Sequence, residues 1–282
     1  MAFHFCPNLK KHKLLAWYFL MSAFTRNRTD GYKPLFFLFC LFALGWITVL
    51  LYAGGMTTSI KAGMAFLDWP LSNGSVNPAG WLTESDKMAE HSHRLLGMKI
   101  GILSIGLFLW TYLRESREWV RTLARVLLWV VILQGLLGGA RVRFDQLNIM
   151  SDHNLLAQGF AVIHACGAMV VLGILVTLTL ASTRRWIEAS AGLNIQQPVG
   201  VKRWGIIATV AIFLQILVGA IMRHADAGLA LVKFPMSTAT TWLPTYWNFD
   251  VSVHFAHRIG AILVTVILVV FLYKLWGSPT AK

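Results

Sequence analysis

Charged residues are scarce in this sequence, and acidic ones are the scarcest. Only 13% of the 282 residues are charged, whereas 56% are hydrophobic. The hydrophobic residues come in blocks about as long as the ~20 residues that a helix needs to cross a bilayer. This composition argues against a soluble domain and predicts an all-α polytopic protein embedded in the lipid bilayer.

The few acidic residues leave a large basic excess. Twelve Asp and Glu stand against 25 Lys and Arg, which gives a formal charge of +13. A nucleic-acid-binding protein gathers such an excess on one face or stripe. Here the basic residues alternate from loop to loop, as membrane topology requires. We therefore predict no nucleic-acid partner.

Cysteine is also rare. The three cysteines, Cys6, Cys40 and Cys166, are scattered and form no CxxC motif, and two of them fall inside hydrophobic segments. This distribution does not support a disulfide framework.

Six hydrophobic stretches are predicted to span the membrane. The first covers residues of about 35–53, and the second begins within residues 90–97 and ends at about 113. The other four cover about 126–140, 155–180, 204–222 and 251–276. We divide the chain into four segments. A basic cytoplasmic segment (1–34) precedes an N-terminal four-helix bundle (35–181), and a cytoplasmic linker (182–203) leads to a partial C-terminal bundle (204–282).

The positions of the basic residues predict the orientation of these spans. Lys and Arg concentrate in the N-terminal segment, in the loops after the second and fourth spans, and near the C-terminus. By the positive-inside rule these parts, including both termini, are cytoplasmic, and the three longer loops lie outside. We expect an integral protein of a bacterial-type plasma membrane.

The most informative motif is the octapeptide from Glu90 to Gly97, where a polar loop becomes a hydrophobic run. An acid, two imidazoles and a guanidinium at the start of a span are costly to insert and are usually kept for a function. In a helix, Glu90 and His93 share one face, which would place a carboxylate beside a metal ligand.

This motif belongs to an internal repeat. Residues 54–65 align with 219–230, and Trp69-Pro70-Leu71-Ser72 aligns in the same register with Phe234-Pro235-Met236-Ser237. With one residue dropped, His93-Arg94 then aligns with His257-Arg258, and Glu90 with His254. Each copy runs from a span through a long loop into a span that begins with His-Arg. Because His254 replaces Glu90, we expect one half to do chemistry and the other only to hold a cofactor.

A further histidine, His164, lies inside the fourth span among small residues. Its ring nitrogens need partners inside a bilayer, which favours a functional role. His93 and His164 lie toward the outer ends of their spans, and two His on separate helices of a bundle commonly hold haem iron from both sides. Zinc, with three or four ligands, is the alternative.

Two further sets of polar residues have alternative interpretations. Glu90 either pairs with Arg94 at i+4 or acts as a carboxylate at the reacting edge of a haem. Arg94 and Arg258 either bind haem propionates or anchor the helices at lipid headgroups. His91 has no assigned role, and a solvated role at the outer rim is predicted for Arg141, Arg143, His153, Arg223 and His224.

Together these residues resemble the haem A synthase family. The resemblance runs from about residue 35 to 276 and rests on Gly54-Gly55-x-Thr57-Thr58, Ala62-Gly63-Met64-Ala65, Asp68-Trp69-Pro70-Leu71, Glu90-x-x-His93-Arg94, Leu137-Gly138-Gly139-Ala140, His164 and His257-Arg258. Members are similar in having two pseudo-symmetric four-helix bundles, each with a His pair.

The resemblance implies oxidation of a methyl group of haem O to a formyl group through hydroxylated intermediates, with haem b as the cofactor. It implies that His93 and His164 ligate the iron of the substrate haem, that Glu90 is the catalytic carboxylate and that His257 is one axial ligand of haem b. As partners it implies haem O synthase or a polypeptide that supplies further helices.

The sequence departs from the family pattern in two places. The seventh and eighth helices, with the second axial His of the cofactor half, are expected to be absent, and His254 is a substitute ligand only if the helix distorts. The outer loop lacks the cysteine pair that some members carry. Alternative functions are a b-type cytochrome or haem-binding membrane subunit, and a haem-holding assembly factor without catalysis.

Overall fold

The structure is a computed structural model, and it describes residues 31–146, 154–192 and 198–278. In these residues the regular elements are helices, and no strand is present. They are α2 (Pro34–Ser59), α3 (Ser85–Arg114), α4 (Glu118–Gln146), α5 (Leu155–Ala181), α6 (Arg184–Gly192), α7 (Val199–His224), the 3-10 helix η1 (Ala227–Leu229) and α8 (Phe249–Trp276).

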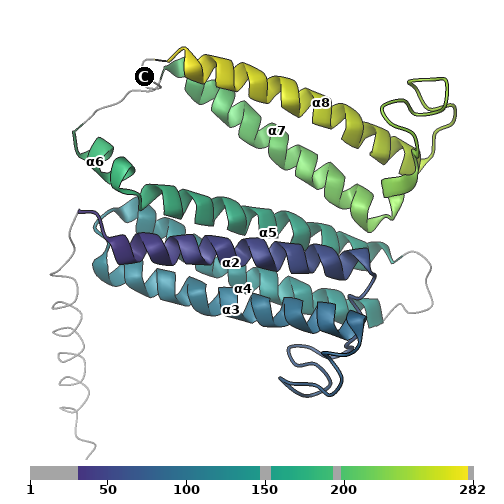
Figure 1. Ribbon diagram of the computed structural model, residues 1–282, viewed down its shortest axis with the longest axis horizontal. Coiled ribbons are helices and arrows are strands. Elements are labelled where there is room, and N and C mark those ends of the chain that lie inside the picture. The colour runs from purple at the N-terminus through teal and green to yellow at the C-terminus, as the bar shows by residue number, and fades with distance from the viewer. Residues whose placement is uncertain (1–30, 147–153, 193–197, 279–282) are drawn as a thin grey trace, which may run out of the picture. The chain divides into compact units, whose positions relative to one another are not determined.

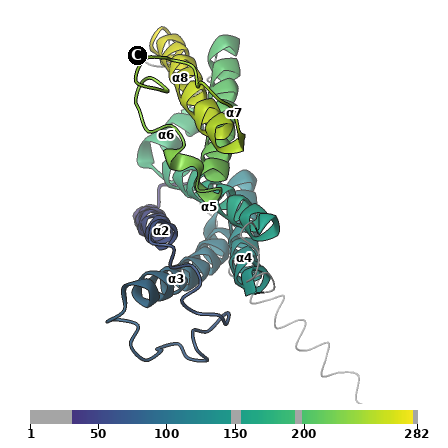
Figure 2. The ribbon, with the colours of Figure 1, turned by 90° about the vertical axis from the view of Figure 1, so that its right-hand side faces the viewer.

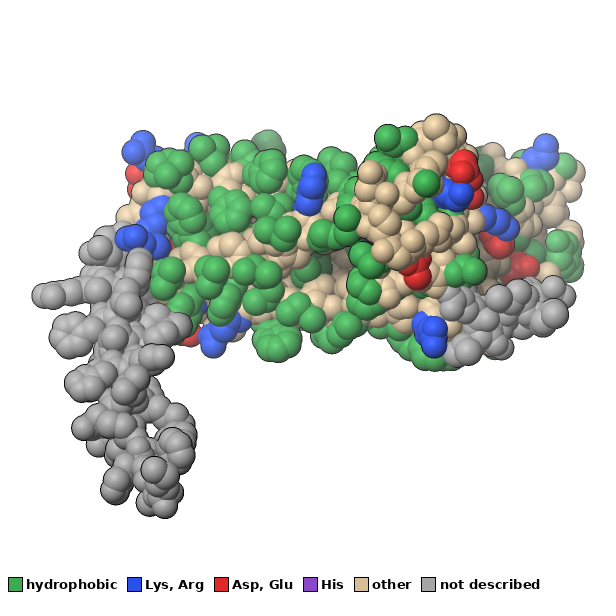
Figure 3. Space-filling view, turned by 90° about the horizontal axis from the view of Figure 1, so that it is seen from below, with side chains coloured by type: hydrophobic (Ala, Val, Ile, Leu, Met, Phe, Trp, Pro, Cys, Tyr) green, Lys and Arg blue, Asp and Glu red, His purple; other side chains and the backbone are tan. Residues whose placement is uncertain are grey.

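Six of these helices, α2 to α5, α7 and α8, are long and apolar enough to cross a membrane. The six predicted spans are therefore confirmed. The surface is also consistent with a membrane, because the space-filling view shows hydrophobic side chains along the length of the described face that it draws, with few charged ones between them (Figure 3). Such a surface would be unstable in water and is normal against lipid.

The helix ends differ from the prediction in several places. Helix α2 continues through Gly54 to Ser59, and α4 begins at Glu118, so that Arg121 and Arg125 are helical and not in a loop. A short helix, α6, lies in the predicted linker. The reason is that hydropathy marks the part of a helix inside the bilayer, while helices continue into the polar region wherever backbone hydrogen bonds are satisfied.

The chain divides into two compact units, and the predicted split into residues 35–181 and 204–282 stays a prediction. The first unit combines residues 1–55, 92–132 and 171–192, and the second combines residues 56–91, 133–170 and 193–282.

In the first unit, parts of α2 to α5 pack side by side around a hydrophobic core (Figure 1). Its most buried side chains come from all four helices and include Ile47, Leu107, Leu127 and Leu175, each at most 2% exposed. Cys40 lies in this core, and neither it nor Cys166 forms a disulfide. Four helices with one shared core form a bundle in this unit.

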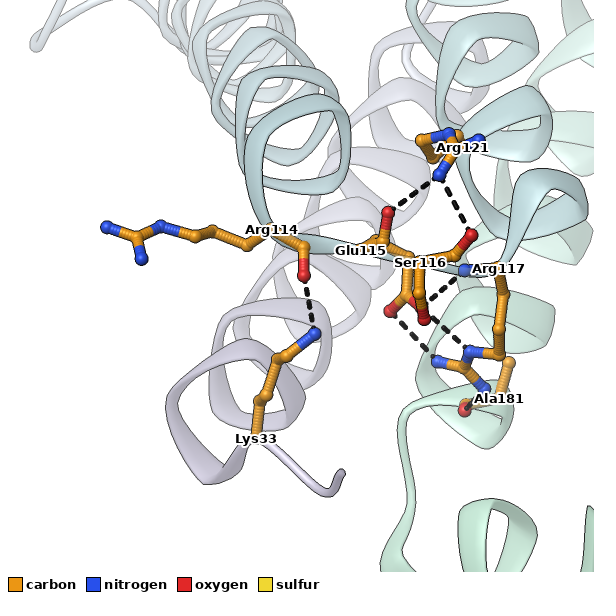
Figure 4. A network of polar contacts seen from close by, with 7 residues as sticks. All are labelled: Lys33, Arg114, Glu115, Ser116, Arg117, Arg121 and Ala181. Carbon is orange, nitrogen blue, oxygen red and sulfur yellow. Dashed lines mark hydrogen bonds and ion pairs between the residues drawn. The ribbon is translucent and has the colours of Figure 1, made fainter. Parts of the chain in front are cut away.

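One end of this bundle is closed by a polar network (Figure 4). The Arg117 guanidinium donates to both carboxylate oxygens of Glu115, at 2.9 and 3.0 Å, and to the Ala181 carbonyl at 2.8 Å. Arg121 donates to the Glu115 and Ser116 carbonyls, and Lys33 to the Arg114 carbonyl. The network therefore joins the ends of α2, α3, α4 and α5.

In the second unit, α7 and α8 form an antiparallel pair (Figure 2). They are joined by a long loop that contains η1, and the side chain of Asn248 caps α8 by accepting the Val251 N–H. The equivalent loop after α2, residues 60–84, also belongs to this unit. The second unit therefore holds both copies of the repeated loop.

Candidate functional site: two repeated loops and their imidazoles

The two loops have the same backbone features at aligned positions. Lys61 and Asp226 have positive φ angles of 56° and 55°, and the peptide bonds Trp69-Pro70 and Phe234-Pro235 are both cis. Positive φ is uncommon for residues other than glycine, so two matching instances are not a coincidence of sequence alignment. The internal repeat is therefore confirmed in the backbone conformation.

A buried hydrogen bond at an aligned position contributes to fixing each loop to the following helix. The Phe66 N–H donates to Oε2 of Glu90 at 3.1 Å, and the Leu231 N–H donates to Nδ1 of His254 at 3.2 Å. Glu90 is 4% exposed and His254 is 8% exposed. A buried backbone N–H needs an acceptor, so one role of each side chain is to supply it.

Arg258 extends this contact in the second repeat. It donates to Nε2 of His254 at 3.2 Å, to the Leu231 carbonyl at 2.6 Å and to the Met236 carbonyl at 3.2 Å. Both ring nitrogens of His254 thus face N–H donors, although a neutral imidazole has only one acceptor. This geometry argues against His254 as an iron ligand. Two N–H donors of Arg258 bind carbonyls of the loop and a third binds His254 on the same helix, and the propionate role of Arg258 stays a prediction.

His91, which had no assigned role, fixes the first loop. Its Nδ1 lies 3.0 Å from the Ser72 hydroxyl and its Nε2 lies 3.2 Å from the Val76 carbonyl oxygen. The ring is 3% exposed and stands edge-on to Trp81, with centroids 4.8 Å apart. His91 is therefore part of the loop packing.

The imidazoles of His93 and His257 lie against glycines at aligned positions. A Cβ added to Gly54 would come within 2.8 Å of Cε1 of His93, and one added to Gly219 within 2.9 Å of Cε1 of His257. Both distances are shorter than carbon atoms tolerate in a packed protein. Each glycine thus makes room on α2 or α7 for an imidazole from α3 or α8.

His164 lies on α5 against the glycine pair that ends the third span. A Cβ on Gly138 would lie 3.5 Å from Cε1 of His164, and one on Gly139 would lie 2.5 Å from the ring of Trp69. Gly139 therefore leaves the space that Trp69, the residue before the cis proline, occupies, whereas a Cβ on Gly138 would make only an ordinary contact with His164.

The remaining predictions concern the His93–His164 pair, the outer rim and the N-terminal segment. The pairing of His93 with His164 stays a prediction, because they belong to different units. At the outer rim, Lys61 and Asp226 form an exposed ion pair at 3.3 Å, and Arg223 contacts the Ser59 hydroxyl. His153 and the predicted segment 1–34, up to residue 30, lie outside the described residues.

No group of three or more His, Cys, Asp or Glu that could hold a metal ion occurs among the residues whose placement is described. Zinc commonly takes three or four such ligands in proteins. The zinc alternative therefore gains no support from this part of the chain, whereas a haem needs only one or two axial side chains.

Two glutamines beside the histidines escaped the sequence analysis. The side-chain amide of Gln215 contacts His257, and the backbone of Gln134 is hydrogen-bonded to His164. Both residues stand four positions before the glycine that faces the imidazole, in the pattern Gln-x-x-x-Gly. The shared Gln-x-x-x-Gly spacing was the only sequence pattern that could have drawn attention to the two glutamines. The pattern does not reveal that a histidine on another helix lies beside them.

Comparisons with known proteins identify the family. A family model described as "Cytochrome oxidase assembly protein" matches residues 82–281. The chain is 32% identical over 230 residues to a protein of Bacillus licheniformis named heme A synthase. The aligned region covers 78% of this chain and 70% of that protein.

Two further relatives carry the same name. The chain is 28% identical over 244 residues to the protein of Shouchella clausii, covering 85% of this chain and 75% of the relative. It is 27% identical over 237 residues to the protein of Symbiobacterium thermophilum, covering 82% and 71%. On the basis of these matches the chain belongs to the haem A synthase family of integral membrane, cytochrome oxidase assembly proteins.

Proposed function

We propose that this chain is a membrane oxidoreductase of haem A biosynthesis. Its substrate is haem O, one methyl group of which it oxidises to a formyl group through hydroxylated intermediates. Family membership supports a role in haem A synthesis, and relatives named heme A synthase support an enzyme. The observation that carries the proposal is the glycine-backed imidazole, which occurs at the same aligned position in both repeats.

The residues present fit a haem. His93, His164 and His257 each project from a hydrophobic helix, and Gly54 and Gly219 provide the room that the imidazoles of His93 and His257 occupy. Imidazoles on helices of a bundle are common ligands of haem iron. His93 and His164 would hold the iron of the substrate haem, and His257 would be one axial ligand of haem b. When bound, haem b supplies a one-electron carrier. Arg94 and Arg258 would stand near the propionates.

Glu90 is proposed as the catalytic carboxylate. It lies three residues before His93 on α3, and its side chain is buried. A buried carboxylate beside a reacting methyl group stabilises developing positive charge or takes a proton. The hydrogen bond from the Phe66 N–H to Oε2 helps to orient the carboxylate.

The direct test is to express the chain in a host that makes haem O but has no haem A synthase of its own. Pigments are then extracted and identified by chromatography and mass. We expect haem A or its hydroxylated precursor to be formed. If only haem O and haem b are recovered, the chain is a b-type cytochrome, a haem-binding subunit or a non-catalytic assembly factor. If the purified protein carries no haem, all of these assignments fail.

The glycine contact gives a second test, by the substitution Gly54→Ala. The new Cβ would lie 2.8 Å from Cε1 of His93, so the imidazole has to move. Overpacking of this kind costs about 1–3 kcal/mol, which corresponds to a fall of about 5- to 150-fold in haem O affinity. The measurement is haem O retained per protein after titration and gel filtration.

The matched control is Gly55→Ala on the same helix, because a Cβ there meets nothing within 4 Å. Both alanines raise helix propensity, so neither variant should unfold α2. Equal haem O retention by the two variants would contradict the assignment of His93 as a ligand.

A further inference from the structure

An arginine at the end of α4 lies beside one of the proposed haem ligands. Arg141 is half-buried, and no hydrogen bond or ion pair joins its guanidinium to any residue that the structure describes. A guanidinium has five N–H donors and is always charged, so leaving it without an acceptor in a partly buried place is costly. The solvated role predicted for Arg141 does not account for this placement.

The guanidinium of Arg141 covers a glycine of the first repeated loop. A Cβ on Gly63 would come within 3.1 Å of Nη2 and within 3.5 Å of both Cζ and Nη1 of Arg141. Gly228 stands at the aligned position of the second loop, and a Cβ there would meet nothing within 4 Å. The first loop therefore makes room for a cation at a position where the second loop has none.

Arg141 stands one helical turn from the point where α4 faces His164. A Cβ on Gly138 would lie 3.5 Å from Cε1 of His164, and Arg141 follows Gly138 by three residues on the same helix face. At about 1.5 Å of rise per residue, Arg141 lies about 4.5 Å farther toward the end of α4. Its charge interacts with the His164 imidazole, and both residues belong to the second unit.

A second arginine of the same unit is close to this place. His224, at the end of α7, interacts electrostatically with both Arg141 and Arg223. The carboxylate of Asp226 pairs with Lys61 at 3.3 Å, and among the described residues neither arginine forms an ion pair. Two uncompensated cations beside each other attract an anionic ligand.

The side of the membrane adds to this argument. The ends of α4 and α7 that carry Arg141 and Arg223 are predicted to lie outside, where the positive-inside rule makes arginines uncommon. A haem has two propionate carboxylates on one edge of its ring, and arginine binds a carboxylate through two parallel charge-assisted hydrogen bonds. The donors of Arg258, in contrast, already bind two loop carbonyls and His254.

We infer that Arg141 binds a propionate of the substrate haem, next to the iron that His164 holds, and that Arg223 neutralises the second propionate. This inference rests on the proposed function, because it assigns His164 to the iron of haem O. The first repeated loop then shapes the propionate end of the substrate site, because Gly63 leaves the space that the Arg141 guanidinium occupies.

The test compares haem O with its dimethyl ester, in which both carboxylates are methylated and uncharged. The full chain in detergent is titrated with each haem, and the absorbance gives two dissociation constants. Their ratio, ester over haem O, is then compared between variants, so that the unequal partition of the two haems into detergent cancels. A hydrogen bond to a charged group contributes enough to lower this ratio about 10- to 150-fold in Arg141→Gln.

Three further substitutions define the origin of the effect. Arg141→Lys keeps the charge without the two parallel hydrogen bonds, so its ratio should lie between those of Arg141→Gln and the unmodified protein. Arg223 is exposed, so Arg223→Gln should lower the ratio only about 1.5- to 5-fold. Arg143→Gln is the control, because it removes an exposed charge two residues away on α4, and it should leave the ratio unchanged.

Gly63→Ala provides an independent variant that keeps Arg141. Its Cβ would displace the guanidinium, which is the end of a flexible side chain, so the loop should stay folded. We expect the ratio to fall in the same direction as in Arg141→Gln and by a smaller factor. The matched control is Gly228→Ala at the aligned position, where the space is open and the ratio should not change.

The outcomes separate this inference from the proposed function. If the unmodified protein binds no haem O, or His164→Ala binds it as tightly, the proposed function fails in its substrate half. If His164→Ala weakens binding while Arg141→Gln has the ratio of the unmodified protein, only the inference about Arg141 is overturned. That result includes equal weakening of both haems, which would make Arg141 a brace for the loop. A ratio lowered as much by Arg143→Gln would also overturn it, because any cation at this end of α4 would then suffice.

Discussion

Glu90→Gln is expected to abolish conversion of haem O while bound haem is retained. Under the proposed function the substitution removes the charge and the proton-accepting ability of the group beside the reacting methyl. A positioned acid or base contributes about 10²- to 10⁴-fold to a rate, so product should fall by at least about a hundredfold. The measurement is haem A and its hydroxylated precursor formed per bound haem O.

The structure shows why glutamine is the right replacement. Glu90 also accepts the Phe66 N–H, and the amide oxygen of glutamine can accept the same hydrogen bond. The loop after α2 should therefore stay in place. Glu90→His copies the second repeat, where His254 accepts the equivalent N–H, so it too should keep the loop while losing activity.

A neighbouring carboxylate supplies the control. Glu84 is exposed and lies just before α3, and its carboxylate pairs at 2.7 Å with Lys87 in the first turn of that helix. Glu84→Gln therefore removes a charge from the same segment without touching the buried site. It should leave activity within about twofold. Formation of haem A by Glu90→Gln at the normal rate would show that Glu90 only anchors the loop.

Glu115→Gln is expected to give the largest loss of stability. Glu115 is 3% exposed, and its carboxylate receives three hydrogen bonds from Arg117, two from the guanidinium and one from the backbone N–H. Removing one partner of a buried ion pair leaves the other charge uncompensated, which costs about 3–5 kcal/mol at a fully buried site and less here, because the Arg117 side chain is 20% exposed. Thermal unfolding in detergent or lipid nanodiscs measures the change.

The contribution of Glu115 should depend on pH. Burial by itself would raise the pKa of this carboxyl, but the hydrogen bonds and charge of Arg117, together with Lys33, outweigh burial and hold the pKa below the usual 4.5. The unfolded chain therefore binds more protons near that pH, and stability rises with pH. The stabilisation is complete above pH 4.5 and is lost as the pH falls through the lowered pKa.

The stability difference between the unmodified protein and Glu115→Gln should accordingly shrink below pH 4.5. Glu188→Gln is the control, because Glu188 forms an exposed i,i+4 pair with Arg184. An exposed pair contributes about 0.2–1 kcal/mol, so this variant should unfold almost normally at every pH. A Glu115→Gln protein that is as stable as Glu188→Gln at neutral pH would contradict the role of the network.

Much of this protein follows from its sequence by short-range rules. Six apolar stretches of bilayer length fix six spans, because a chain in lipid has to satisfy its backbone hydrogen bonds within each helix. The internal repeat was visible as aligned residues, and the equal φ angles of Lys61 and Asp226 confirm it. His93, His164 and His257 stood out because imidazoles are costly inside a membrane.

The tertiary structure decided what each polar group touches. The sequence places Glu90 and His254 at one aligned position, but only the fold shows that both accept a backbone N–H from the preceding loop. Gln215 looked like any polar residue in a span until α8 brought His257 to its amide. Periodicity and hydropathy are properties of one segment, whereas a hydrogen bond between helices depends on their packing, and for that reason these partners were known only from the structure.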